Sequence, residues 1–131
     1  MERALKEKTE WTRRAVFDSN GKVLSMEGSI SIQDLKGYLT AFNDKDTTFG
    51  NGFNIDGKNY EVHRFYEDDG LIYGRTHSVD PRDGEGFCFA RAKRGTTGEW
   101  IYAIITYKFP VLSAKAVPEL QDFMRQFVCN Q

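Results

Sequence analysis

The sequence has little of the chemistry that enzymes and metal sites use. Its 131 residues include two cysteines, two histidines and three prolines. Cys88 and Cys129 lie far apart without a Cys-x-x-Cys motif, so we expect free thiols in a reducing compartment rather than a disulfide framework. His63 and His77 have no cysteine or carboxylate partner at metal-ligand spacing. We therefore expect no metal site and no cofactor.

Charge of one sign and long apolar runs are also missing. Lys plus Arg number 18 and Asp plus Glu 19, a net charge of −1, which argues against a nucleic-acid-coating protein. No apolar run is long enough to span a membrane. The charged stretch from Met1 to Glu10 lacks the apolar core of a signal peptide, so we expect a cytoplasmic protein. Gly-rich phosphate loops and nucleophile elbows are absent, and we expect a binding module rather than an enzyme.

Aromatic residues are abundant instead. They make up 14% of the chain, within a hydrophobic share of 40%, and can build a dense core in a small protein. Cys88 stands between Phe87 and Phe89, so we expect a buried thiol with a raised pKa. No linker or repeat interrupts the sequence. We expect a single domain over residues 1–131.

The first half predicts two helices around a hairpin. Residues 2–12 contain good helix formers, and Asn20-Gly21 favours a tight hairpin turn between strands in residues 15–26. Apolar residues at helical spacing, preceded by a Ser31 cap, predict a helix over 32–43. Gly37 weakens that helix, so we expect a close neighbour that needs the missing side chain.

The second half predicts five strands and a closing helix. On the strand from Asn59 to Tyr66, simple alternation puts His63 on the side of Phe65, as a half-exposed strand histidine. The residues Val117, Leu120, Met124 and Phe127 form a helical stripe. Either Ser113 caps a helix that contains Pro118 in its early turns, or Pro118 is the first helical position, which costs less. Clustered strands between helices indicate an α+β fold with an antiparallel sheet. The five strands are expected within residues 53–55, 59–66, 71–76, 87–93 and 99–108, the last as a central strand covered on both faces.

Several strings in this order resemble profilin, the small actin-monomer-binding protein. They are Gly57-Lys-Asn-Tyr-Glu-Val-His-Arg64, Leu71-Ile-Tyr-Gly-Arg75, Ala90-Arg-Ala-Lys93 and Leu120-Gln-Asp-Phe-Met124. The resemblance implies a central antiparallel sheet with the terminal helices on one face and the internal helix on the other. It also implies binding of monomeric actin and regulation of actin filament assembly, in the cytoplasm and at the cytoskeleton.

The resemblance places the actin contact on the strands and at the start of the last helix. Residues 86–108 carry four basic side chains against Glu99 alone, which agrees with an acidic partner surface. Arg91 and Lys93 are two apart and share a strand face. We expect Arg75 to lie with Arg91 and Lys93 on one outward surface. The resemblance implies that acidic phosphoinositides could bind the same surface. The implied actin-binding residues are Arg64, Arg75, Arg91, Lys93, Lys108 and Lys115.

Profilins bind polyproline through an N-terminal Trp and Tyr three residues apart, stacked with C-terminal aromatics. The chain departs from this pattern, because its first helix carries no such pair. Trp11, Phe123 and Phe127 are the candidate polyproline contacts. The polar loop from Ser78 to Glu85 is longer than in common profilins. These differences indicate a divergent member, of the kind found in archaea that encode actin-like proteins.

Two other classes of protein are alternatives to profilin, the first of which also places helices around a small antiparallel sheet. A roadblock or longin-type trafficking domain would act by dimerising, whereas a profilin is expected to be a monomer. A PAS-like sensor or small enzyme would need an internal cavity, which the many aromatic side chains argue against. Light scattering and a test of actin binding distinguish these alternatives.

Overall fold

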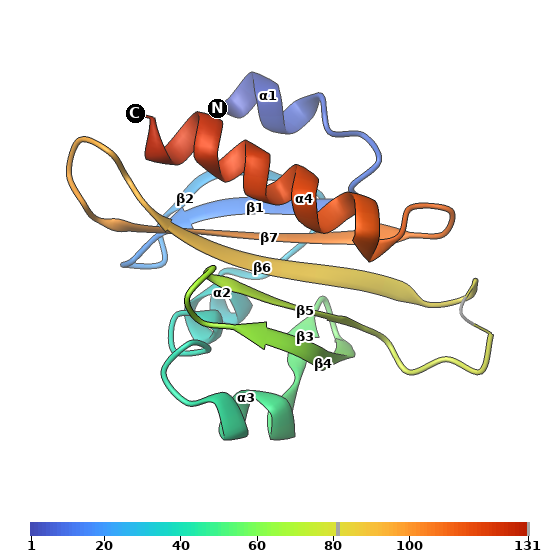
Figure 1. The fold of residues 1–131 in the computed structure, drawn as a ribbon. Coiled ribbons are helices and arrows are strands. Elements are labelled where there is room, and N and C mark those ends of the chain that lie inside the picture. The colour runs from blue at the N-terminus through green and yellow to red at the C-terminus, as the bar shows by residue number, and fades with distance from the viewer. Residues whose placement is uncertain (81, 131) are drawn as a thin grey trace.

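A computed structural model describes residues 1–80 and 82–130, so the predicted loop from Ser78 to Glu85 is described except at position 81. The chain forms a seven-stranded antiparallel sheet with helices on both sides (Figure 1). The expected α+β class is confirmed. The elements are α1 (Glu2–Lys6), β1 (Arg13–Asp18), β2 (Val23–Glu27), α2 (Ile32–Tyr38), α3 (Lys45–Asn51), β3 (Phe53–Ile55), β4 (Lys58–Tyr66), β5 (Leu71–Arg75), β6 (Glu85–Lys93), β7 (Trp100–Lys108), α4 (Ser113–Met124) and a π-helical turn η1 (Arg125–Cys129).

The strand order is β2-β1-β7-β6-β5-β4-β3, so the last strand in sequence lies in the interior of the sheet, next to its middle strand β6. β7 pairs with β1 on one side and with β6 on the other. Every residue from Ile101 to Tyr107 is buried. The apolar, β-branched composition of this segment suits a strand covered on both faces, and the prediction of a central strand is confirmed.

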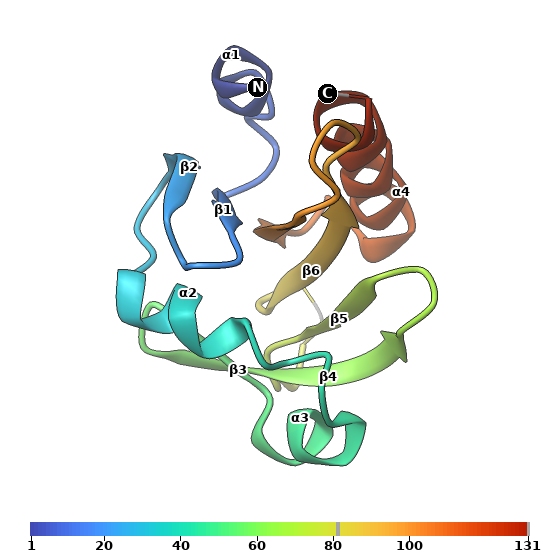
Figure 2. The same cartoon turned by 90° about the vertical axis from the view of Figure 1, so that its left-hand side faces the viewer.

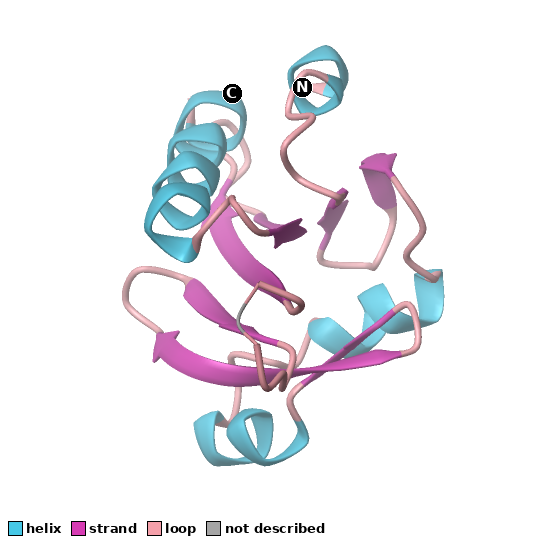
Figure 3. Cartoon of the chain, turned by 90° about the vertical axis from the view of Figure 1, so that its right-hand side faces the viewer, coloured by secondary structure: helices cyan, strands magenta, loops and turns pink. Residues whose placement is uncertain are grey.

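The terminal helices α1 and α4 and the internal helix α2 cover opposite faces of the sheet (Figures 2 and 3). Leu5 of α1 and Leu120 of α4 pack in one core cluster with Val16 and Ile105 of the sheet. Leu35 of α2 belongs to a second cluster on the other face. This arrangement is the one that the profilin resemblance implied. Among the described residues, no helix is both long and apolar enough to cross a membrane.

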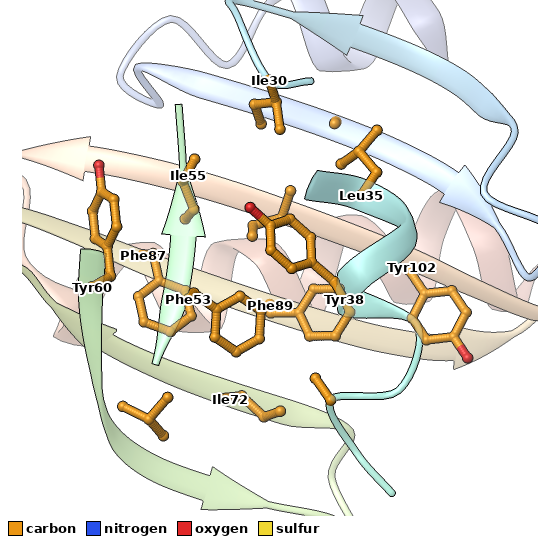
Figure 4. Close-up of a cluster of buried hydrophobic side chains, with 14 of the residues drawn as sticks. Ile30, Leu35, Tyr38, Phe53, Ile55, Tyr60, Ile72, Phe87, Phe89 and Tyr102 are labelled. Atoms are coloured by element: carbon orange, nitrogen blue, oxygen red, sulfur yellow. The ribbon is translucent and has the colours of Figure 1, made fainter. Parts of the chain in front are cut away.

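The core on the α2 side is built mainly from aromatic rings (Figure 4). Phe53 lies 4.7 Å from Phe87 and 5.3 Å from Phe89 between ring centroids, and Tyr38 lies 5.0 Å from Phe53. Tilted and offset aromatic pairs at such distances add to the stabilisation that burial provides. The high aromatic content therefore fills the space between α2, β3 and β6.

The helices differ from the sequence predictions in length and number. α1 ends at Lys6 rather than near residue 12, and the predicted helix over 32–43 ends at Tyr38. A separate helix, α3, follows; its cap Asp44 accepts a hydrogen bond from the Thr47 amide. The expectation of a close neighbour at Gly37 is wrong, because a Cβ there would meet nothing within 4 Å.

The last helix follows the earlier of its two predicted starts, not the one at Pro118 that was expected to cost less. α4 starts at Ser113, so Pro118 lies inside it rather than at its first position. A proline there removes a backbone hydrogen bond, but starting early lets Ala116 and Val117 pack against the sheet. The π-helical turn that follows shifts the buried stripe, so that Val128 is buried and Phe127 only half-buried.

Candidate functional site

A β-bulge in β4 decides which side chains face outward on the neighbouring strands. The pairing of β4 with β5 shifts register between Val62 and Arg64. Val62 and Phe65 are both buried on the α2 side, so Arg64 turns to the opposite face, where it pairs with Tyr73. The predicted alternation of His63 with Phe65 is therefore wrong, because the bulge inserts an extra residue. His63 is nonetheless half-exposed, as predicted.

Gly74 of β5 accommodates this bulge. A Cβ at Gly74 would lie 1.8 Å from the Glu61 carbonyl oxygen and 2.9 Å from the His63 amide nitrogen. No other amino acid fits there without moving the backbone of β4. The glycine between Tyr73 and Arg75 thus sets the register that brings Arg64 beside them.

We call the resulting surface the strand face and define it as Arg64, Tyr66, Tyr73 and Arg75. Tyr66 is 42% exposed, and its ring centroid lies 6.1 Å from that of Tyr73. Arg64, Tyr73 and Arg75 line a hollow of about 280 Å³ together with Ser113. Burial, with Tyr66 as a close neighbour, raises the pKa of Tyr73, so its hydroxyl stays protonated at neutral pH.

The start of α4 is fixed beside the strand face by Tyr107. A Cβ at Gly86 would lie 2.3 Å from the Tyr107 ring, so the absence of a side chain at Gly86 makes room for the ring. The Tyr107 hydroxyl lies 2.7 Å from Ser113 Oγ. Burial raises the pKa of Tyr107, which keeps this hydroxyl able to donate. The strand face and the first turn of α4 therefore form one surface.

Arg91 and Lys93 lie on the other face of the sheet, so the expected common surface with Arg75 does not form. Arg91 pairs with the core residue Tyr102, and Lys93 pairs with Trp100. The Arg91 guanidinium carbon stands 4.3 Å from the Phe42 ring centroid and 4.4 Å from that of Trp100. Lys93 Nζ lies 5.1 Å from the Trp100 centroid. These cation–π contacts cover the aromatic core at this end of the sheet.

Lys108 and Lys115 lie in two further places. Lys108 Nζ is 3.3 Å from Oε1 of Glu85, a side chain whose exposed fraction is 5%. Glu85 and Lys93 are eight residues apart on β6, about 26 Å along the strand, so Lys108 is remote from Lys93. Lys115 Nζ lies 3.8 Å from Glu119 on α4. Of the six predicted actin-binding residues, the structure brings together Arg64 and Arg75.

The three candidate polyproline residues meet between α1 and α4. The Trp11 and Phe123 centroids are 6.0 Å apart, and those of Phe123 and Phe127 are 4.9 Å apart. Trp11 is 0% exposed, however, and its Nε1 has no hydrogen-bond partner. A buried ring offers no surface on which a proline-rich segment could stack without a movement of α1 or α4.

Both cysteines are free thiols, as expected: Cys88 is buried in the core and Cys129 is exposed. Burial raises the pKa of the Cys88 thiol, as expected for a residue between two phenylalanines. Within residues 1–80 and 82–130, no cluster of three metal-ligating side chains occurs. The geometry on the strand face is that of a contact surface, with arginine and tyrosine as its main side chains.

Sequence reasoning missed Tyr66, Tyr73 and Ser113 as members of this surface. The alternation of Arg64 with Tyr66 and of Tyr73 with Arg75 was a usable signal, because residues two apart share a strand face. Tyr and Arg are also the residue types that dominate binding hot spots. For Ser113 the signal was its place at the start of the last helix, where the resemblance puts part of the contact.

An antiparallel sheet with the two terminal helices on one face and an internal helix on the other is the profilin fold. No family model matches the chain, and no curated protein matches it by sequence. Solved profilin structures match over nearly the whole chain. The Schizosaccharomyces pombe profilin has a TM-score of 0.68 at 22% identity, covering 94% of this chain and 91% of its own.

Two other solved structures give the same result. Acanthamoeba castellanii profilin II has a TM-score of 0.65 at 21% identity and covers 92% of this chain and 89% of its own. LokiProfilin2, solved in complex with rabbit actin, has a TM-score of 0.64 at 13% identity, covering 96% and 90%. The profilin resemblance inferred from the sequence is thus confirmed in the fold, which favours it over the roadblock or longin alternative.

Proposed function

We propose that this protein binds monomeric actin, or an actin-like monomer, through the strand face and the first turn of α4, and so regulates filament assembly. The observation that carries the proposal is the juxtaposition of Arg64, Tyr66, Tyr73 and Arg75 beside Ser113, around one hollow. The complex of LokiProfilin2 with rabbit actin supports a protein of this fold in such a role.

The physical character of the strand face agrees with a protein partner. Tyrosine and arginine supply large contact areas and hydrogen-bond donors, and they are enriched at the centres of protein interfaces. α4 lies over β6 and leaves the outer part of β4 and β5 beside it (Figure 1). The two arginines favour a partner with acidic groups opposite them and would speed association at low salt.

The test is a titration of monomeric actin with the wild-type protein and three charge-reversal variants. Arg64→Glu should weaken binding at least tenfold, because it places a negative charge in the contact. Lys36→Glu, at an exposed position of α2, should bind as the wild type does. Wild-type protein should also slow spontaneous polymerisation by holding monomers in a one-to-one complex.

Lys93→Glu distinguishes the two faces of the sheet. Because Lys93 lies on the α2 side, this variant should leave actin binding unchanged if the strand face is the contact. Loss of binding in Lys93→Glu with retention in Arg64→Glu would move the contact to the α2 side. No complex with wild-type protein would overturn the proposed function.

Proline-rich segments and acidic phosphoinositides are the two other predicted partners. Stacking of a proline-rich segment would require the buried Trp11 to become accessible. A phosphoinositide headgroup could meet Arg64 and Arg75 together, but Arg91 and Lys93 only from the opposite side. Polyproline and phosphoinositide vesicles added to the actin titration test both: vesicles that bind through Arg64 should compete with actin, whereas polyproline should not.

A further inference from the structure

Two large apolar side chains are exposed on the segment that joins β7 to α4. Phe109 is 52% exposed and Leu112 is 53% exposed. One exposed leucine is ordinary on a protein surface. These two, however, line the same small hollow, which they share with Arg75 and Ser113. Neither belongs to a core cluster, so their position beside the strand face is available for a partner.

Three hollows adjoin at this end of the molecule. The hollow of the strand face shares Arg75 and Ser113 with the one under Phe109 and Leu112. That hollow in turn shares Gly84 and Phe109 with a third one, of about 450 Å³. The surface is therefore continuous from the strand face, past the start of α4 and round the end of the sheet, to Glu85 and Lys108 on the α2 side.

The charged residues that line the third hollow are Lys58, Arg82, Asp83, Glu85 and Lys108, which leaves a net positive charge. Lys58 and Lys108 each place their ammonium 3.3 Å from Oε1 of Glu85, and Arg13 approaches Oε2 at 3.3 Å. Glu85 and Asp56, which also binds Arg13, balance two of these three cations. The lysine side chains are 52% and 58% exposed. Each ammonium has three donors, so both can still bind an incoming oxygen anion.

We call this surface the terminal groove and define it as Lys58, Lys108, Phe109 and Leu112. We propose that the terminal groove holds an acidic, extended segment of the same actin monomer that binds the strand face. One apolar side chain of that segment packs against the exposed surfaces of Phe109 and Leu112, and a carboxylate binds Lys58 and Lys108. This inference rests on the proposed function, since the strand face and the terminal groove are continuous.

A protein segment fits the terminal groove because the two halves of the groove differ in chemistry: Phe109 and Leu112 are apolar, and Lys58 and Lys108 are cationic. The apolar half requires a side chain with a large nonpolar surface, and the lysine half requires an anion within a few residues of it. The lysines are held by a buried carboxylate, so they lose little conformational freedom on binding. Such a preorganised pair favours a single placed carboxylate.

The test compares actin binding by matched variants whose folding is verified by circular dichroism. Phe109→Ser combined with Leu112→Ser should weaken the complex about tenfold, whereas Ile32→Ser, at a 57% exposed position on α2, should change it less than twofold. Lys108→Gln should slow association and reduce its salt dependence, whereas Lys36→Gln should do neither.

The outcomes separate this inference from the proposed function. One outcome is that Arg64→Glu loses binding while the Phe109 and Leu112 double variant and Lys108→Gln bind actin unchanged. This outcome contradicts the terminal groove as a contact and supports the strand face. Absence of any complex with wild-type protein overturns both. Anionic vesicles and a single-stranded oligonucleotide are titrated in parallel. Binding of either that the double variant and Lys108→Gln both abolish would overturn the choice of a protein segment.

Discussion

Glu85 connects strands that are far apart in the sequence. Its carboxylate accepts hydrogen bonds from Arg13 of β1 and from Tyr60 and Lys58 of β4, and it forms an ion pair with Lys108 of β7. Burial alone would raise the pKa of Glu85, but the hydrogen bonds from Tyr60 and the two lysines outweigh it and hold the pKa below its ordinary value. The charged form is therefore the one that stabilises the fold.

The lowered pKa of Glu85 predicts the direction in which the stability of the protein changes with pH. A carboxylate with a lowered folded-state pKa stabilises the protein above its unfolded pKa, and that stability is lost as pH falls through the folded value. We expect the free energy of unfolding, measured with urea, to fall from pH 7 to below pH 4. Glu85→Gln should cost about 2 kcal/mol at pH 7, less than a fully buried ion pair, because both lysines stay half-exposed.

The control for Glu85 is Glu67→Gln, an exposed carboxylate in the turn after β4. It should leave both the stability at pH 7 and its pH dependence within about 0.5 kcal/mol of wild type. Equal acid sensitivity in wild type and Glu85→Gln would show that other carboxylates govern the acid transition.

Arg91 shows what residue-level reasoning could and could not reach. The spacing of Arg91 and Lys93 correctly placed the two on one face of β6, since residues two apart share a face. Which face that is depends on Phe87 and Phe89, the next residues of the same parity, which pack under α2. Both faces of β6 are apolar along most of its length, so the sequence alone does not choose between them.

At the scale of elements, Gly37 and Gly74 differ in whether the fold has room for a side chain at their position. Gly37 lies within α2 with no atom near its missing side chain, and its φ is not in the left-handed region. Gly74 lies within β5, where a Cβ would collide with the backbone of β4. The first weakens an element without a packing reason, and the second is required by the bulge.

We therefore predict opposite effects of alanine at these positions. Gly37→Ala should raise the free energy of unfolding by up to about 1 kcal/mol, because alanine favours the helix. Gly74→Ala should lower it by more than about 2 kcal/mol, because β4 and β5 must separate to admit the methyl group. Urea unfolding followed by far-ultraviolet circular dichroism measures both. Similar losses in the two variants would contradict this account.

The elements that the sequence predicts well are those with strong local signals. The Asp56-Gly57 hairpin forms as expected, with positive φ at both residues. The β1–β2 hairpin also forms, but the expectation of positive φ at both Asn20 and Gly21 is wrong, because φ is positive at Gly21 and not at Asn20. α3 was missed because its seven residues carry one buried side chain, Thr48, and so show no apolar periodicity. The β4 bulge was missed because its cause lies on the neighbouring strand, at Gly74.

At the scale of the whole molecule, the order of elements and the profilin strings together were enough to predict the sheet and its helical layers. The strand face, the proposed contact surface, was predicted only in part. Arg64 and Arg75 were assigned to it, but Tyr66 and Tyr73 were not, and the basic residues expected to join Arg75 are spread over both faces. Which side chains share a face of the sheet depends on strand register and on bulges, and both are determined by the pairing of strands that are far apart in the sequence.

The interior position of β7 in the sheet has a consequence for the dynamics of the chain. Its amides are bonded to β1 or β6 and covered on both faces, so local fraying at an edge cannot open them. We expect their deuterium uptake, followed by mass spectrometry, to require global unfolding, whereas β3 at the sheet edge should exchange much sooner. Equally fast uptake in β7 and β3 would be inconsistent with this order. If β7 exchanges only through global unfolding, the uptake rate of its peptide reports the global free energy of unfolding. That rate can be followed in mixtures and in the presence of any partner.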